Sequence, residues 1–221
     1  MKKKNGFTLA EVLITLAIIG VVATLTLPAL MSNTAEQQAV TALRKSVNTL
    51  SEVAQMSAAV DGFDYSGLNE TMTPGTADTI DANGVVKQSL WAMLSSKANV
   101  DRKMSGTSKI TGTGGCSTNT SQIFFTDGTV LCYTDVATGD KGADEAIIKG
   151  YIDTNGVKGP NLNFTCSSVE CKPNERKYGD EFPITLKGAV VYPGHVKFTA
   201  NKVEDDGTEA ENNAARWAMR K

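Results

Sequence analysis

The sequence predicts an α+β protein in which one long helix comes first and antiparallel strands follow. An almost uniformly apolar run from Phe7 to about Leu30 passes into an amphipathic segment of helical periodicity. Later in the chain, short β-branched and aromatic runs are separated by turns that contain glycine. Helical and strand segments do not alternate, which argues against a parallel sheet.

The apolar run contains a single acid, Glu11, and is long enough to cross a membrane. A helix needs about 20 consecutive apolar residues to span a bilayer. A charge inside such a span costs roughly 2.5–3.5 kcal/mol on insertion scales, so we expect Glu11 to have a partner and a function. Cleavage between Gly6 and Phe7 would supply one, because the new α-amino group would lie one helical turn from Glu11.

The amphipathic segment continues this helix and has one apolar stripe. Its apolar residues recur at spacings of three and four, with polar residues between them. The stripe comprises Val40, Leu43, Val47, Leu50 and Ala54. We expect this half of the helix, up to about Ala59, to lie against a sheet. Gly20 and Pro28 should weaken the first half, because proline lacks a backbone donor and glycine costs about 1 kcal/mol relative to alanine.

A short helix and a hairpin are predicted after Asp61-Gly62, which ends the long helix. The helix is expected over Val86–Lys97, where apolar residues share one face. The hairpin is expected to pair residues 123–126 with residues 129–133. Between them, Asp127-Gly128 suits a two-residue turn with positive φ angles.

The remainder of the chain is predicted to form further strands joined by polar loops. Strands are expected over residues 146–153, 183–192 and 195–200. The acidic stretch Glu204–Glu209 is interpreted as a solvated loop. These strands complete the antiparallel sheet of the predicted α+β domain.

Composition argues against two classes of function. The chain has 22 Lys+Arg and 24 Asp+Glu, a net charge of −2, and loss of Lys2, Lys3 and Lys4 would leave 19 against 24, or −5. This balance gives no strong signal for nucleic-acid binding. The chain has one histidine and no G-x-S-x-G, H-E-x-x-H or phosphate-binding glycine loop, so we expect no enzymatic activity.

The N-terminal segment resembles the class III signal of type IV prepilins and type II secretion pseudopilins. The similarity comprises a short basic leader that ends in Gly6, the sequence Phe7-Thr8-Leu9, Glu11 as the fifth residue after the cut, and the apolar helix through Val22. It implies that a membrane-embedded prepilin peptidase cuts after Gly6 and N-methylates Phe7. It also implies that Glu11 guides docking into a filament.

The resemblance further implies a pilin-like fold, in which a long N-terminal helix, membrane-spanning in its first half, packs on a small antiparallel sheet domain. Gly20 and Pro28 fall where many family members have a helix-loosening glycine and a kinking proline. The expected parts are a cleaved leader, a membrane-spanning and filament-core helix, an amphipathic helix and an extracytoplasmic domain. Their respective bounds are residues 1–6, 7–30, 31–60 and 61–221.

The expected function is that of a structural subunit of a type IV pilus or a type II secretion pseudopilus. Its partners would be prepilin peptidase, other pilin or pseudopilin subunits, an assembly platform membrane protein and membrane lipid. It would cross the cytoplasmic (inner) membrane once and end in a periplasmic pseudopilus or a surface pilus. One alternative is a minor tip-located pilin that acts in adhesion or DNA uptake, although Glu11 favours an internal position. The other is a signal-anchored extracytoplasmic protein.

The four cysteines suit an exported domain, where an even count favours disulfides. Four cysteines allow three pairings. We favour Cys116 with Cys132 and Cys166 with Cys171, because each pair is local in sequence. Zinc is the alternative, but the spacing lacks paired C-x-x-C motifs and the one histidine, His195, is distant.

A calcium loop is one interpretation of the sequence Asp153-Thr154-Asn155-Gly156, with Asp180 as a further ligand brought near by folding. Some major pseudopilins bind calcium in the C-terminal domain, which is consistent with the resemblance. The run lacks the full EF-hand pattern, however. The competing interpretation is a turn in which Asn155-Gly156 accepts positive φ and Asp153 caps the backbone. No other cofactor is expected, and these two interpretations remain open.

Overall fold

The computed structural model describes residues 6–68, 89–105, 110, 112–118, 121–133, 147–199 and 202–220. The chain divides into two compact units, Met1–Gln38 and Ala39–Lys221. The long helix α1 (Leu9–Val60) contributes to both units. Each unit is described separately below.

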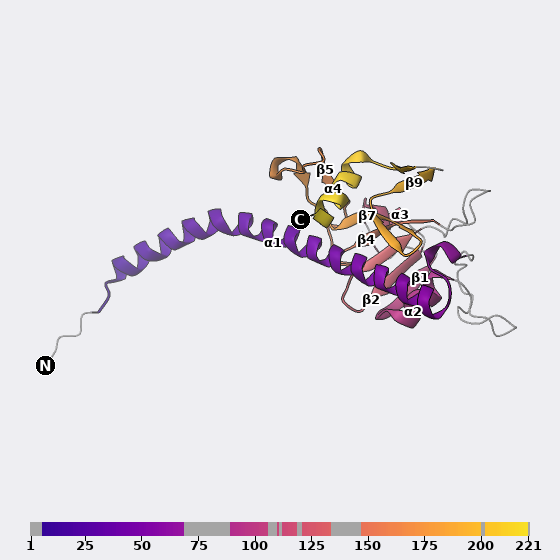
Figure 1. Ribbon diagram of the computed structural model, residues 1–221. Coiled ribbons are helices and arrows are strands. Elements are labelled where there is room, and N and C mark those ends of the chain that lie inside the picture. Colours follow the sequence, from indigo (N-terminus) through magenta and orange to yellow (C-terminus); the bar gives the residue numbers. More distant parts are fainter. Residues whose placement is uncertain are drawn as a thin grey trace. The chain divides into compact units, whose positions relative to one another are not determined.

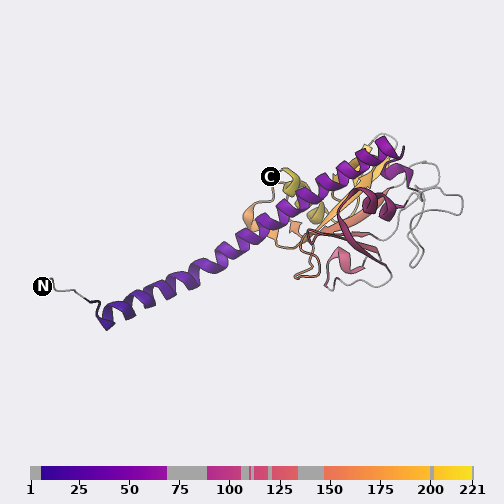
Figure 2. The ribbon, with the colours of Figure 1, turned by 90° about the horizontal axis from the view of Figure 1, so that it is seen from below.

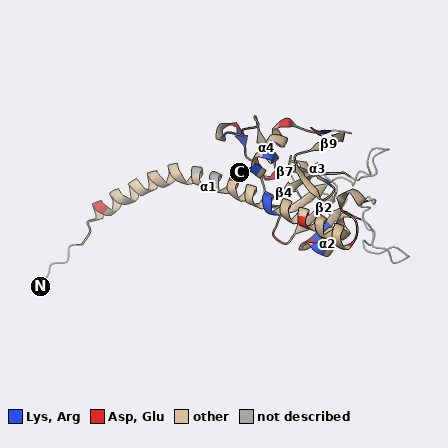
Figure 3. Ribbon diagram, viewed as in Figure 1, with Lys and Arg blue, Asp and Glu red and all other residues tan. Residues whose placement is uncertain are grey.

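In the first unit, α1 presents an apolar surface to its surroundings. Its segment Leu9–Leu27, 19 residues, is long and apolar enough to cross a membrane, and none of it is buried within the chain. Glu11 is the one charged residue in this stretch by sequence, and Figure 3 shows the acidic colour near the start of α1. The three hydroxyls of Thr15, Thr24 and Thr26 donate to backbone carbonyls one turn earlier. These side chains therefore satisfy their polar groups inside the helix.

The helix assignment of α1 runs through positions 20 and 28 without interruption. Glycine lacks a side chain that restricts the backbone, and proline lacks an N–H to donate, so both weaken a helix without having to end it. The helix-loosening role of Gly20 and Pro28 stays a prediction.

In the second unit, α1 packs on the sheet through the predicted stripe. The five stripe residues are all buried, which confirms the periodicity argument. Figures 1 and 2 show this part of α1 alongside the sheet. The stripe shares one apolar core with Ile123, Leu131 and Ile184 of the sheet. After α1, a short 3-10 helix (Tyr65–Gly67) returns toward it, and the buried Tyr65 hydroxyl donates to the carbonyl of Leu50 at 2.7 Å.

The sheet has six strands in the order β1-β2-β3-β4-β7-β8, and each neighbouring pair is antiparallel. This arrangement confirms the α+β prediction. The strands are β1 (Val100–Ser105), β2 (Ser121–Phe125), β3 (Val130–Tyr133), β4 (Ile148–Asp153), β7 (Glu181–Lys187) and β8 (Val190–Pro193).

Alternate side chains of the strands face two different clusters. Ile123 and Leu131 face the core shared with α1, whereas Phe124 and Cys132 join a smaller cluster on the opposite face. That second cluster also includes Cys116, from the short helix α3 (Gly115–Thr118). The sheet therefore has a helix-covered face and a face closed by a loop that carries a disulfide.

Two small sheets, one 3-10 helix and two α-helices complete the described chain. The elements are β5 (Thr165–Cys166) paired with β6 (Arg176–Lys177), β9 (Val196–Thr199) paired with β10 (Lys202–Asp205), a 3-10 helix (Pro173–Glu175), α2 (Leu90–Lys97) and α4 (Glu209–Arg220).

The predicted hairpin is present, but its turn is longer than expected. Phe124 pairs with Val130, and the Phe125 N–H donates to the carbonyl of Thr129, which leaves a three-residue loop. Gly128 has a φ of 91°, while Asp127 does not have a positive φ. This is the pattern of a type I turn followed by a left-handed glycine, so the prediction of a two-residue turn was wrong.

Several boundaries differ from the sequence-based prediction. The short helix begins at Leu90, because the Ser89 hydroxyl accepts from the Ala92 N–H and caps it. Residues 86–88, 146 and 200 of the predicted elements lie outside the described residues. The single strand expected over 183–192 is divided into β7 and β8 by a turn at Gly188, whose φ is 60°.

The acidic stretch 204–209 forms the expected loop only over residues 206–208. It begins in β10 and ends in the first residue of α4. Asp205 forms an ion pair with Arg216, and Asp206 forms one with Lys149. These cationic partners stabilise an ordered backbone in a segment whose composition alone indicated a loop.

Candidate functional site

The start of α1 is capped by reciprocal hydrogen bonds between Thr8 and Glu11. The Glu11 Oε2 atom accepts hydrogen bonds from the Thr8 N–H at 2.8 Å and from the Thr8 hydroxyl at 2.9 Å. In return, the Thr8 hydroxyl accepts from the Glu11 N–H at 3.3 Å. This is a capping box, which satisfies backbone donors that have no partner within the helix. Glu11 therefore has a local structural role at the first turn.

Gly6 and Phe7 lie ahead of the helix, in backbone without regular secondary structure. The Phe7 side chain is 91% exposed. The peptide bond between these two residues is therefore outside the hydrogen-bonded turns of α1. Residues 1–5 of the basic leader lie outside the described residues.

Residues 1–27 match a protein-family model described as the prokaryotic N-terminal methylation motif. The chain carries the signal of type IV prepilins and pseudopilins. No curated protein and no solved structure matches the chain. The prepilin signal implies processing by prepilin peptidase and assembly with other pilins, and the apolar helix fits membrane anchoring. It points to a structural protein rather than an enzyme.

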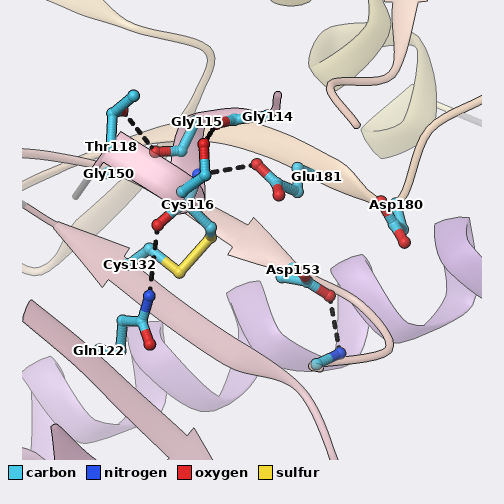
Figure 4. Close-up of a disulfide and its surroundings, with 12 residues drawn as sticks. Gly114, Gly115, Cys116, Thr118, Gln122, Cys132, Gly150, Asp153, Asp180 and Glu181 are labelled. Carbon is cyan, nitrogen blue, oxygen red and sulfur yellow. Dashed lines mark hydrogen bonds between the residues drawn. A yellow bond between two sulfur atoms is a disulfide. The ribbon is translucent and has the colours of Figure 1, made fainter. Parts of the chain in front are cut away.

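Among the described residues of the second unit, three acids are fully buried: Asp153, Asp180 and Glu181. Asp153 ends β4 and Glu181 begins β7, and the two residues are directly paired across these neighbouring strands. A carboxylate oxygen of each lies within 4.8 Å of the other and of the Cys116 Sγ atom. Figure 4 shows both side chains beside the disulfide. Strand register thus brings together residues that are far apart in sequence.

The structure contains the turn at Asp153 that the second interpretation predicted. Its Oδ1 atom accepts from the backbone N–H groups of Asn155 at 3.0 Å and Gly156 at 2.7 Å. Gly156 has a φ of 71°, in the left-handed region that glycine tolerates. Asp153 and Asn155, two of the residues considered for calcium, therefore form an Asx turn.

Asp180, the third residue considered for calcium, holds this turn against the following loop. Its Oδ2 atom accepts from the Asn155 side-chain amide at 2.9 Å and from the Asn161 N–H at 3.0 Å. Its Oδ1 atom accepts from the Leu162 N–H at 2.9 Å. The sequence-based candidates are thus brought together, with both oxygens of Asp180 engaged by protein donors.

Glu181 was missed by sequence analysis. Its Oε2 atom accepts a hydrogen bond of 2.8 Å from the Cys116 N–H, which joins the disulfide loop to the start of β7. Glu181 directly follows Asp180, and two adjacent acids at the start of a strand do not form a recognisable sequence motif. Glu181 becomes a candidate site residue through the β4–β7 pairing, because that pairing places it opposite Asp153.

Three buried oxygen atoms in this region have no hydrogen-bond partner: Asp153 Oδ2, Asn155 Oδ1 and Glu181 Oε1. Among the described residues, no lysine or arginine forms an ion pair with Asp153, Asp180 or Glu181. Burial, with the nearby charge of Asp180 as a further cause, raises the pKa of Asp153 to about 8. The same causes raise the pKa of Glu181 to about 7.

The four cysteines form the two local pairs that the spacing favoured. Cys116 pairs with Cys132, and Cys166 pairs with Cys171, with Cα atoms 5.2 Å apart in each pair. All four are buried. A disulfide sulfur is not a thiolate, so in this state the cysteines do not supply zinc ligands. Carboxylate oxygens are therefore the groups beside Cys116 that could hold a metal ion.

Proposed function

We propose that the chain is a structural subunit of a type IV pilus or of a type II secretion pseudopilus. The observation that carries this proposal is the single acid, Glu11, in the exposed apolar segment Leu9–Leu27 of a prepilin signal. The proposed parts are a leader over residues 1–6, a filament-core helix over 7–30, an amphipathic helix over 31–60 and an outer domain over 61–221.

The apolar face of the first unit requires a covering partner. Leu13, Ile14, Leu16 and Ile19 are each about 60% exposed within the chain. Water-exposed apolar surface on this scale marks contact with lipid or with another protein. Before assembly the covering medium would be the cytoplasmic membrane, and after assembly it would be the same segment of other subunits.

Glu11 would give this packing a defined register. In a bundle of apolar helices an unpaired carboxylate is costly, and the available counter-charge is the Phe7 α-amine of a neighbouring subunit. A single buried polar residue can fix the register of packed helices. A tip subunit would have no subunit above it to pair with, so the acid favours an internal position in the filament.

Processing would precede assembly. Cleavage after Gly6 by prepilin peptidase would create the Phe7 amine, and methylation would keep it basic. A platform protein in the cytoplasmic membrane would then transfer the subunit into a filament that ends in the periplasm or at the cell surface. The prepilin signal is common to both destinations.

The test compares Glu11→Ala with Thr8→Val, both expressed at wild-type level in an assembly-competent host. Each substitution breaks one half of the capping box, because Glu11→Ala removes the acceptor of the Thr8 N–H and Thr8→Val removes the acceptor of the Glu11 N–H. Only Thr8→Val keeps the carboxylate. Immunoblots would compare sheared filament or pseudopilus fractions with membrane fractions. We expect Glu11→Ala to be cleaved and inserted but strongly depleted from filaments, and Thr8→Val to be retained in them. Equal incorporation of Glu11→Ala and wild type would contradict the proposal.

A further inference from the structure

Two arginines lie at the end of the second unit where α1 enters it. The second unit begins at Ala39 of α1, and Arg44 donates a hydrogen bond of 2.8 Å to the carbonyl of Ala218 near the end of α4. Arg220 is the last residue of α4, and its side chain donates to the carbonyl of Val169 at 2.7 Å. Figure 3 shows the basic colour on this part of α1 and beside the C-terminus.

The charges of Arg44 and Arg220 are not neutralised within the second unit. Both side chains donate to backbone carbonyls, which are dipoles and carry no full negative charge. Among the described residues, neither arginine forms an ion pair with a carboxylate. The C-terminus of α4 offsets only part of their charge, because a helix end is equivalent to about half an elementary charge. Positive charge therefore remains for an external anion.

The hairpin between β5 and β6 adds an exposed tip beside these arginines. The disulfide of Cys166 with Cys171 closes its loop, and Val169 within that loop is 52% exposed. Lys172 pairs with Glu170 at 2.9 Å, but both side chains are more than half exposed, so solvent screens the pair. An exposed apolar side chain bordered by cations is typical of surfaces that enter the interface of a membrane.

The remaining charged groups of this hairpin are one acid and one more cation. Glu175 accepts hydrogen bonds from the Ser168 hydroxyl and the Lys172 N–H. Arg176 lies over the ring of Trp217, a residue of α4, at 4.2 Å from the ring centroid. Cations outnumber acids on this surface, which we call the basic end. It comprises Arg44, Val169, Glu170, Lys172, Glu175, Arg176 and Arg220.

The polypeptide itself limits how far the basic end can lie from the membrane in an anchored subunit. The apolar segment ends at Leu27 and the second unit begins at Ala39, a rise of about 18 Å along α1. The headgroup region adds about 5–7 Å to each side of the hydrocarbon core. This limit holds whatever the angle between the two units, so lipid headgroups are the nearest extended anionic surface.

We propose that the basic end binds the headgroups of anionic phospholipids while the subunit is anchored in the membrane. Guanidinium groups suit this role, because they can donate two parallel hydrogen bonds to phosphate oxygens. The contact would hold the outer domain against the bilayer, and it would be released when the subunit leaves the lipid for a filament. This inference rests on the membrane stage of the proposed function and does not depend on filament assembly.

The test uses the full chain in lipid nanodiscs made of phosphatidylcholine alone or of phosphatidylcholine mixed with phosphatidylglycerol. Hydrogen exchange would be followed by mass spectrometry. Each cation near an anionic surface strengthens the attraction roughly fivefold, so the anionic lipid should slow the exchange of residues 167–172 and 216–220 severalfold. High salt should remove this difference, because it screens exposed charges.

The double variant Lys172→Gln with Arg220→Gln should lose most of the lipid-dependent slowing. The matched control is Lys197→Gln with Lys202→Gln, in β9 and β10, and Figure 1 shows β9 away from the C-terminus. Each double variant removes one cation of an exposed ion pair and one cation that forms no ion pair with a described residue. The control should keep the slowing. Comparing the two lipids within each variant cancels any change in loop stability.

Equal exchange of the basic end in the two lipids, or equal losses in the two double variants, would overturn the inference. An equal slowing by polyglutamate in neutral nanodiscs would assign the basic end to an acidic protein instead. Residues 9–27 report membrane insertion separately. Protection of these residues without a lipid effect at the basic end would contradict this inference alone, whereas their rapid exchange would contradict the proposed membrane anchoring as well.

Discussion

The Arg44 Nε atom donates a hydrogen bond of 2.8 Å to the backbone carbonyl of Ala218. Ala218 lies in the last turn of α4, where carbonyl groups have no partner within the helix. The guanidinium also places positive charge at the negatively polarised end of that helix. A side chain of α1 therefore completes the C-terminal helix of the outer domain.

Replacing Arg44 should destabilise the outer domain. We expect Arg44→Met to lower the free energy of unfolding by about 1–2 kcal/mol, because a charge-assisted hydrogen bond is lost while the aliphatic packing is kept. Lys45→Met is the control, since the pair of Lys45 with Asp127 is exposed and should contribute less than about 1 kcal/mol. Urea unfolding of both variants measures the difference, and equal effects would contradict the capping role.

The parts of the fold that follow from local periodicity were predictable from the sequence. The buried stripe of α1 follows from its spacing of three and four, and the hairpin follows from Asp127-Gly128. The C-terminal helix α4 was missed because its composition is polar. Asn212 is nevertheless buried, because its side-chain amide pairs with both backbone groups of His195. Such a tertiary contact cannot be read from a helical pattern.

A capping signal for α4 was present in the sequence. Thr208 is followed three residues later by Glu211, the spacing of a capping box, and the Thr208 carbonyl accepts from Asn212. Ala214, Trp217 and Ala218 then share a buried face. Local signals could therefore have found this helix, whereas the Asp153–Glu181 pair required knowledge of which strands are neighbours.

The two hydrogen bonds between Asn212 and His195 give a second prediction. Asn212→Ala should destabilise the domain by about 2–3 kcal/mol, because the N–H and carbonyl of His195 would lose buried partners. Asn48→Ala provides the matched control on an exposed position of α1. Thermal unfolding followed by circular dichroism would measure both, and a loss below that of Asn48→Ala would contradict the assignment.

His195 should make stability depend on pH. Burial lowers the pKa of His195, while Gly150, Glu211 and Asp206 favour the protonated form and Lys149 opposes it. The folded state therefore binds a proton less readily than the unfolded state, whose pKa is about 6.5. The contribution of His195 to stability should be fully present above that pH. It should decline as the pH falls through about 6.5 toward the lower pKa of the folded state.

The comparison is between wild type and His195→Gln, unfolded in urea at pH 7.5 and pH 5.5. The buried acids titrate in both proteins, so their contribution cancels in the difference. We expect the wild type to lose more stability on acidification than the variant. An equal loss of stability in both proteins would mean that His195 does not cause the pH dependence.

The two disulfides should contribute unequally to stability. Their cysteines are separated by 16 positions for Cys116 and Cys132 and by 5 for Cys166 and Cys171. The entropy of loop closure predicts about 3 kcal/mol for the longer loop and about 2 kcal/mol for the shorter one. Paired Cys→Ser variants should follow this order in chemical denaturation, and non-reducing peptide mapping of exported protein should find no free thiols. Four alkylatable thiols would refute the pairing.

Processing should be sensitive to the backbone at Gly6. Gly6→Ala should slow cleavage severalfold, because alanine favours helix by about 1 kcal/mol over glycine and would draw the bond toward α1. Co-expression with a prepilin peptidase, followed by intact-mass measurement, would detect a product that begins at Phe7. A mature terminus after Pro28, or unchanged cleavage of Gly6→Ala, would contradict this expectation.

The capping box between Thr8 and Glu11 consists only of atoms on the mature side of that bond. Removing the leader therefore breaks none of the contacts that begin α1, and precursor and product share the same first turn. The peptidase can act on backbone without regular secondary structure and does not need to unwind a helix. Maturation then changes the charge just ahead of a helix that is already formed. The first turn of α1 does not need to refold before assembly.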